Sequence, residues 1–192
     1  QQPPVAPPAS AKEAGEFVVG LYKALESQTP DVRRLAAAID PDLLLERATA
    51  GLSSRPPEAW SAAARLRLAR EVPRMVRSVF PEGVIAVGPR AVGSAQGPDG
   101  ATVVTVRFYR IDLRGGAPRP AWHLVHVARK TAGWRLADID QLDSGDRLSY
   151  AAIERLTDPR EEKLPREGGG PVALLLAKTL LAGIVIALAL GL

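Results

Sequence analysis

ATVVTVRFYRIDLR, residues 101–114, alternates apolar and polar side chains and is rich in β-branched residues, which is typical of a half-buried strand. Successive side chains of a strand point to opposite faces. Val104, Val106 and Phe108 therefore share one apolar face, while Arg107 lies on the other. A strand of this kind belongs to a sheet that helices cover on one side only.

Three further segments have the same texture, at about residues 83–95, 119–130 and 133–141. The turn sequences GPDG, GGAP and TAG separate the four segments. Connections this short join antiparallel neighbours, because a parallel crossover needs a much longer segment. The fold class predicted is therefore α+β, with N-terminal helices packed on one face of a curved four-stranded antiparallel sheet.

Four helices are predicted before this sheet and one after it. Ser10 with Glu13 matches a capping box, and a proline follows both Thr29 and Asp40 at the first helical position. The expected helices lie at about 11–28, at two short segments starting after Thr29 and Asp40, and at about 57–80 and 146–156. With the sheet they make one domain over residues 11–157.

The longest predicted helix has two distinct faces. Its apolar face carries Leu66, Ala69, Val72, Val76 and Val79, and Pro73 is expected to kink it. Its other face is a basic ridge of four arginines, namely Arg67, Arg70, Arg74 and Arg77. The ridge either contacts anionic lipid headgroups or is an ordinary charged helix surface.

The sequence ends in an apolar run, VALLLAKTLLAGIVIALALGL, residues 172–192. At ~1.5 Å per residue a helix of this length spans about 31 Å, which matches the hydrocarbon core of a bilayer. Its leucines, isoleucines and valines outweigh the single Lys178, whose side chain can snorkel to the near interface. We predict one transmembrane helix over 171–192, joined to the domain by a linker over 158–170.

Small residues recur every four positions along this span, at Thr179, Gly183, Ala187 and Gly191. Such a stripe lets another transmembrane helix approach closely. It also arises simply because small residues are common in spans, and the sequence leaves both interpretations open.

The sidedness of the membrane protein is also left open. Residues 1–10, QQPPVAPPAS, form a flexible Pro-rich lead of the kind that follows a removed export signal, which favours a periplasmic or other extracytoplasmic domain. Basic residues before the span, Arg160, Lys163 and Arg166, favour the cytoplasmic side instead.

Composition excludes several classes of function. The chain has no cysteine, which excludes disulfides, thiolate metal sites and a cysteine nucleophile. The net charge of +4 is too small to favour a nucleic-acid partner. Known catalytic motifs are absent, so we expect no enzyme, no cofactor and no metal. An acid/base pocket built from Tyr22, Tyr109, Tyr150 and the aspartates is a minor alternative.

Two groups of side chains that could bind a metal ion are interpreted as parts of the fold instead. His123 and His126 lie three apart on a strand, so they face opposite sides of the sheet and do not share a metal. Asp138, Asp140, Asp143 and Asp146 are interpreted as a solvated turn with a helix N-cap at Asp143 or Ser144, a weak cation site being the alternative.

Four segments carry a resemblance to a known family, namely IDPDLLLERATAGLS, PPEAWSAAARLRLAREVPRMV, VVTVRFYRID and GWRLADIDQLDSGDRLS. Over about residues 14–156 the chain resembles the periplasmic phospholipid-binding proteins of the Mla pathway, also called the toluene-tolerance or ABC-transporter auxiliary family. The positions carried over are Trp134, Asp138, Ile139, Gly145 and Ser149. The nuclear-transport-factor-like fold shares the same order of helices and curved sheet.

The resemblance implies a cavity for acyl chains between the sheet and its helices, with a transporter and an outer-membrane assembly as partners. The residues expected to line it are Val104, Val106, Phe108, Trp122 and Leu124. We therefore expect a membrane-anchored, non-enzymatic lipid-binding or lipid-transport module whose partners are membrane lipid and other transmembrane helices. The alternative is an accessory or scaffold subunit, or an extramembrane domain, of a larger membrane complex or channel.

Overall fold

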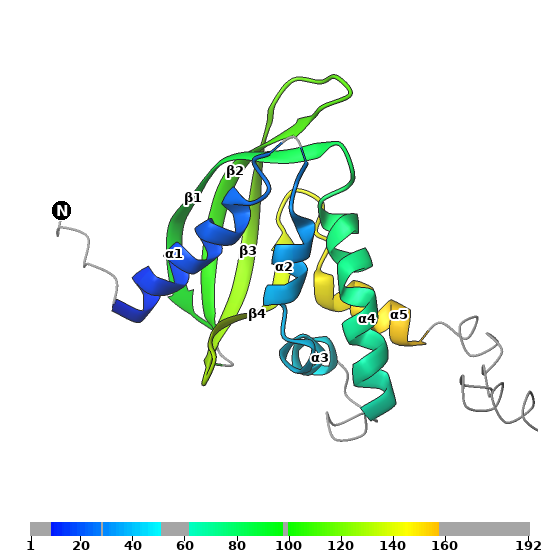
Figure 1. Cartoon of the computed structure of the whole chain (residues 1–192). Helices are drawn as coiled ribbons and strands as arrows, with labels where there is room; N and C mark the ends of the chain where they lie inside the picture. Colours follow the sequence, from blue (N-terminus) through cyan, green and yellow to red (C-terminus); the bar gives the residue numbers. More distant parts are fainter. Residues whose placement is uncertain (1–8, 28, 51–61, 98–99, 158–192) are drawn as a thin grey trace, which may run out of the picture. The chain divides into compact units, whose positions relative to one another are not determined.

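The computed structural model describes residues 9–27, 29–50, 62–97 and 100–157 of the chain. They form an α+β domain with an open four-stranded antiparallel sheet, as predicted (Figure 1). The helices described are α1 (Ala9–Lys23), α2 (Val32–Ala38), α3 (Pro41–Ala50), α4 (Ala62–Val79) and α5 (Leu148–Thr157). The strands described are β1 (Val84–Gln96), β2 (Thr102–Asp112), β3 (Arg119–Lys130) and β4 (Gly133–Gln141).

The sheet is a simple meander in the order β1-β2-β3-β4, so each strand pairs with its neighbour in sequence. The turn sequences therefore do act as hairpin connections. The β3–β4 ladder contains one irregularity, where His126 pairs with Asp138 but Val127 pairs with Leu136. Ala137 is the extra residue of this bulge, and beyond it the two strands resume regular alternation.

The helix starts follow the capping chemistry in part. Asp40 accepts from the backbone N–H of Asp42 at 2.9 Å and caps α3, whose first residue is Pro41, as predicted. The cap of α2 is Asp31, two residues later than predicted, and its carboxylate accepts from the N–H of Arg34 at 3.2 Å.

The first helix differs from the prediction at both ends. Helix α1 already includes Ala9 and Ser10, so Ser10 is not its N-cap, and it ends at Lys23 rather than at 28. Leu25 is fully buried just beyond this end, in a turn where the backbone has left the helix. The Leu25 carbonyl accepts from the N–H of Ala86, which joins this turn to β1 at 3.2 Å.

Helix α4 buries Val72, Val76 and Val79 as predicted, but its buried stripe differs from the prediction at two positions. The buried residues are Leu68, Val72, Met75, Val76 and Val79. Leu66 is 56% exposed and Ala69 is exposed as well, so their predicted burial is wrong. Leu66 lies about 200° around the helix from Leu68, and only the packing of neighbours decides which side is covered.

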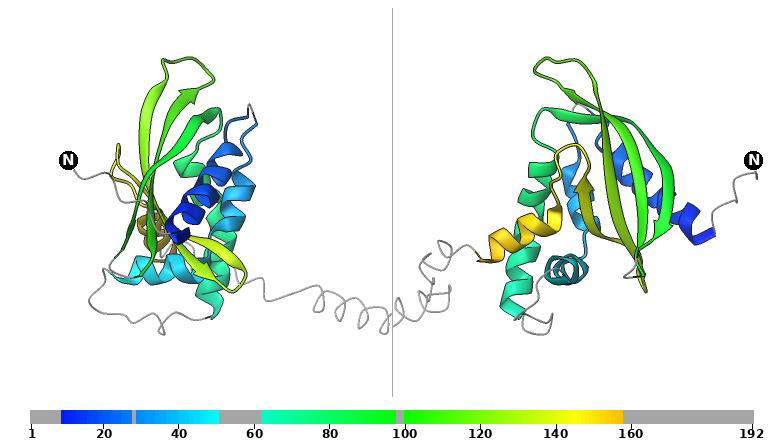
Figure 2. Two further views of the ribbon diagram at one scale, coloured as in Figure 1. Left: turned by 90° about the vertical axis from the view of Figure 1, so that its left-hand side faces the viewer. Right: turned by 180° about the vertical axis from the view of Figure 1, so that it is seen from behind.

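The helices surround the sheet unequally. Helix α1 packs on β1 and β2, whereas α3 and α5 lie beside the edge strand β4 (Figures 1 and 2). Helix α4 packs on the other helices, α2, α3 and α5. The prediction that the helices share one face of the sheet is correct for α1 but wrong for α3 and α5, which also contact the opposite face at the edge strand β4.

The described residues all belong to one compact unit, which ends at Thr157. Among the described residues, no helix is both long and apolar enough to cross a membrane. The predicted linker over 158–170 and transmembrane helix over 171–192 lie outside the described residues. The same holds for the stripe of small residues, Thr179, Gly183, Ala187 and Gly191.

A fragment that lacks residues 168–192 is expected to fold as a soluble monomer. The hydrophobic core of the domain is complete between Ala14 and Ala152, so it needs no contact with the deleted segment. Size-exclusion chromatography and thermal unfolding followed by circular dichroism would check this. Aggregation, or melting without cooperativity, would show that the domain needs the segment.

Candidate functional site

The predicted lipid-lining residues lie on both faces of the sheet. Val104, Val106 and Phe108 face inward and are at most 2% exposed. Trp122 and Leu124 face outward, so their predicted position on the helix-covered face is wrong. They pair with Arg107 and Thr105, whereas the inward neighbour of Val106 is His123. The alternation along one strand does not fix its register against the next, and here the prediction was one residue out of register.

Large rings fill the inward face at this point. Tyr22 of α1, Phe80, Phe108 and His123 form one cluster, in which the Tyr22–Phe108 ring centroids are 5.5 Å apart and those of Phe108 and His123 are 4.8 Å apart. The ring centroid of Phe80 lies 5.6 Å from those of both Tyr22 and His123. The rings contact one another where the resemblance predicted an acyl chain.

A hydrogen bond lies within this cluster, between the Tyr22 hydroxyl and Nδ1 of His123 at 2.7 Å. Burial raises the pKa of Tyr22 well above its ordinary value. Burial also lowers the pKa of His123 to about 4, since the interior disfavours the charged ring. At neutral pH both groups are therefore uncharged, and the tautomer of His123 sets which of them donates this hydrogen bond.

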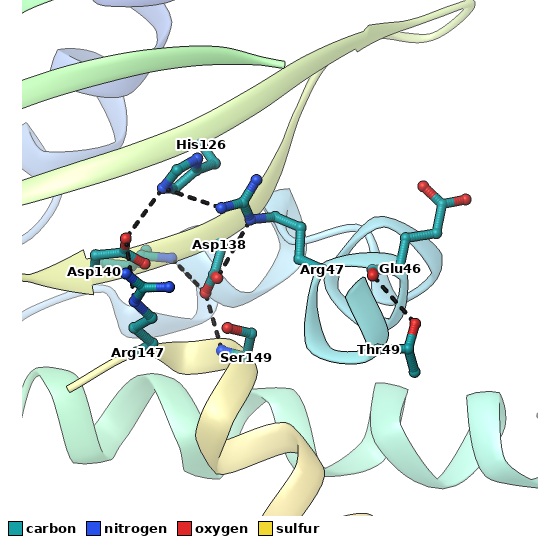
Figure 3. Close-up of polar contacts among 9 residues, drawn as sticks. Glu46, Arg47, Thr49, His126, Asp138, Asp140, Arg147 and Ser149 are labelled. Carbon is teal, nitrogen blue, oxygen red and sulfur yellow. Dashed lines mark hydrogen bonds and ion pairs between the residues drawn. The ribbon is translucent and has the colours of Figure 1, made fainter. Parts of the chain in front are cut away.

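His126 lies on the opposite face, as predicted, and belongs to a second polar cluster beside β4 (Figure 3). Its Nε2 is 3.3 Å from Oδ2 of Asp140 and 3.4 Å from Nη2 of Arg47. Arg47 of α3 also donates from Nε to Oδ2 of Asp138 at 3.4 Å. Nε of Arg147, directly before α5, is 3.5 Å from Oδ2 of Asp140. The cluster thus joins α3, β3, β4 and the start of α5.

Asp138 is the most buried member of this cluster, at 1% exposed. Its Oδ1 accepts from the backbone N–H groups of Ile139 and Ser149, both at 2.9 Å. Ser149 lies in the first turn of α5, so a carboxylate from β4 caps this helix across space.

The interpretation of the four aspartates as a solvated turn is therefore wrong for two of them. Asp138 and Asp140 are buried, whereas Asp143 and Asp146 are exposed. Helix α5 begins at Leu148, so neither Asp143 nor Ser144 is its N-cap. The reason is tertiary, because α3 and α5 bring arginines and N–H groups to the outward side of β4.

Asp140 shows how the cluster balances its charges. Burial opposes ionisation of this carboxyl, but the hydrogen bond to His126 and the charges of His126, Arg147 and Arg47 outweigh it and hold its pKa below the ordinary value. Nδ1 of His126 and Oδ1 of Asp140 are buried without a hydrogen-bond partner among the described residues.

A pocket of about 640 Å³ lies against the cluster, within the ~300–1,000 Å³ usual for ligand sites. Apolar wall residues from four elements include Leu43, Val103, Ala128 and Ile153. Polar residues of the lining include Glu46, Arg47, His126, Arg147 and Tyr150. Sequence reasoning missed this site, and no local signal could have found it, since Arg47 is 79 residues from His126 and 91 from Asp138.

The predicted arginine ridge is not uniform. Nη2 of Arg67 donates to the carbonyls of Arg155 and Leu156 at 3.0 and 2.9 Å, so Arg67 holds the end of α5. Arg74 is paired with Glu71 at 2.7 Å. Arg70 and Arg77 are exposed, and their contact with headgroups stays a prediction.

An acid/base pocket, the minor alternative, requires its three tyrosines to lie together. In the structure they lie apart. Tyr22 lies in the core, Tyr109 is 39% exposed on the outward face of β2, and Tyr150 is 58% exposed on α5. Among the described residues, no group of three or more His, Cys, Asp or Glu side chains is placed to hold a metal ion.

Fold and site together define a class, an α+β domain with an open meander sheet, a packed interior and a mixed polar and apolar pocket at its edge strand. Comparison of the chain with protein-family models and with curated proteins finds no match.

Proposed function

We propose that this chain is a non-enzymatic accessory or scaffold subunit of a membrane complex, anchored by the apolar run at residues 172–192. The observation that supports the scaffold reading over lipid carriage is the ring cluster of Tyr22, Phe80, Phe108 and His123. It occupies the inward face, where a lipid carrier of the resembled family holds its cavity.

The buried polar groups support a non-enzymatic role. The hydroxyl of Tyr22 is bonded to His123 inside the core, and Asp138 is bonded to Arg47 and to two backbone N–H groups. A general base needs a free atom within reach of substrate. These groups instead bond to one another and fix the elements that carry them.

Lipid binding, as in the Mla-pathway family, is the second candidate, and one observation favours it. The pocket beside β4 has apolar walls and arginines at its edge, a combination that suits an amphiphile. If this candidate is correct, the ligand lies on the outward side of the sheet rather than in the interior.

Two substitutions on β2 distinguish the scaffold function from lipid binding. Val106 and Val103 lie on opposite faces of β2, the first fully buried in the core and the second in the wall of the pocket. Val106→Trp is expected to lower the free energy of unfolding by about 1–3 kcal/mol through overpacking, and Val103→Trp by less than that, since it faces open space. Urea unfolding of both variants would measure the difference.

Native mass spectrometry of the same proteins then tests the function. We expect wild type and both variants to carry no stoichiometric lipid. Lipid on wild type that Val103→Trp alone removes would establish the second candidate. Lipid that Val106→Trp alone removes would contradict the packed interior and restore the cavity implied by the resemblance.

A further inference from the structure

The outward face of the sheet presents an exposed cluster of one arginine and two aromatic residues. Nη2 of Arg107 donates to the Tyr109 hydroxyl at 2.8 Å, and the guanidinium carbon lies 5.4 Å from the Tyr109 ring centroid and 5.9 Å from that of Trp122. Tyr109 and Trp122 are each 39% exposed. We call Arg107, Tyr109 and Trp122, with their neighbours Arg90 and Leu142, the aromatic–arginine face.

The neighbours extend this face in both directions across the sheet. Arg90 of β1 is paired directly with Arg107 in the ladder. Leu142 donates its N–H to the Trp122 carbonyl at 2.9 Å, and its side chain is 55% exposed. Large exposed apolar side chains that gather in one place mark an interaction surface.

The charge of the face is unbalanced. Opposed like charges on adjacent strands destabilise a sheet, yet Arg90 and Arg107 are opposed. Among the described residues, neither has a carboxylate in ion-pair contact. The outward positions of β2 from Val103 to Tyr109 carry no acid either. Both arginines are exposed, so an anionic surface outside the domain would find two unpaired cations on this face.

We propose that the aromatic–arginine face docks on the anionic headgroups of the membrane in which the chain is anchored. The proposal rests on the anchoring by residues 172–192 in the proposed function. Tyrosine and tryptophan are enriched at the headgroup depth of a bilayer. There the apolar ring contacts hydrocarbon, while the hydroxyl or indole N–H contacts water and headgroups. Arginines beside them gain from anionic lipid.

The tether favours a lipid surface over a separate acidic protein. The described domain ends at Thr157, and the 14 residues from 158 to 171 precede the apolar run. At ~3.3–3.6 Å per residue this connection reaches at most about 50 Å. The membrane is then present at a high effective concentration, so contacts too weak for a free partner suffice.

The absence of cysteine from the chain allows a direct test, because one introduced cysteine takes one label. Pro120 is exposed and pairs with Tyr109, so Pro120→Cys places a label on the aromatic–arginine face. Glu16→Cys, exposed on α1, places it on the opposite side of the sheet. The full chain, labelled with the environment-sensitive fluorophore NBD, is reconstituted into vesicles of POPC alone or of POPC with POPG.

The label at 120 is expected to shift to shorter emission wavelength and to be quenched by doxyl-labelled lipid in POPG vesicles only. The label at 16 is expected to remain in water in both vesicles. Arg107→Glu is expected to lower the ratio of docked to undocked molecules about 30-fold, and Arg90→Glu, a second route to the same loss, by a similar factor. Lys12→Glu, a charge reversal of an exposed cation on α1 at the opposite side of the sheet, is expected to leave docking unchanged.

Three results would overturn the docking proposal while leaving the anchor intact. The first is a water-exposed label at 120 in a chain that floats with POPG vesicles. The second is equal shielding in both vesicles, which indicates burial without charge recognition. The third is shielding that grows with the protein-to-lipid ratio, which indicates contact between copies. A chain that floats with neither vesicle would overturn the anchor and the docking together.

Discussion

Replacing Asp138 with alanine is expected to lower the free energy of unfolding of the domain by about 3–5 kcal/mol. The carboxylate is 1% exposed, and its removal leaves three donors without their acceptor. These are Nε of Arg47 and the backbone N–H groups of Ile139 and Ser149. The loss exceeds that of an ordinary hydrogen bond because a partly exposed guanidinium and two backbone N–H groups all lose the same charged acceptor.

Asp143→Ala is the matched control, since Asp143 is an exposed aspartate five residues further along the chain. It is expected to change the stability by less than about 0.5 kcal/mol. Urea unfolding of the fragment that lacks residues 168–192 measures both. Equal effects of the two substitutions would mean that Asp138 does not hold α3 and α5 to β4.

Stability is expected to fall by about 3 kcal/mol between pH 7 and pH 4, because of His123. The folded protein holds the pKa of this ring at about 4, against an ordinary value of 6.5. Between pH 7 and pH 4 His123 binds a proton in the unfolded chain but stays neutral in the folded protein, so acid favours unfolding. The stabilisation is complete above about pH 6.5 and is lost as the pH falls towards the folded value.

Titration of the buried Asp140 carboxyl does not contribute to the loss of stability between pH 7 and pH 4. Its pKa is lowered in the folded state, so its contribution is lost below the ordinary carboxyl range rather than above pH 4. The double variant Tyr22→Phe with His123→Leu replaces both hydrogen-bond partners by apolar groups, which is close to neutral when shapes match. It should fold and show a flatter dependence on pH from 4 to 7. An unchanged slope in the double variant would assign the acid sensitivity to another group.

Local chemistry explains why so much of the fold was predictable. The alternation of Val104, Val106 and Phe108 with polar residues defines β2 and its inward face, and short glycine-rich turns make the sheet a meander. Asp40 followed by Pro41 fixes the start of α3. Each of these signals acts within a few residues, so no knowledge of distant segments is needed to read it.

The errors arise where distant segments meet. Trp122 was placed inward because the register between β2 and β3 depends on pairing across the sheet, which one strand does not specify. Leu66 was placed in the core because the covered side of an amphipathic helix depends on which neighbours pack against it.

The sequence by itself determined the α+β class, the order and direction of the strands, and the opposed faces of His123 and His126, because periodicity and turn geometry are properties of the local chain. Only the tertiary structure decided the site. It places Arg47 of α3 against Asp138 of β4, across 91 residues, and packs Tyr22 of α1 against His123 of β3, across 101. Contacts of this kind depend on how whole elements pack, and packing is specified jointly by all the surfaces that meet.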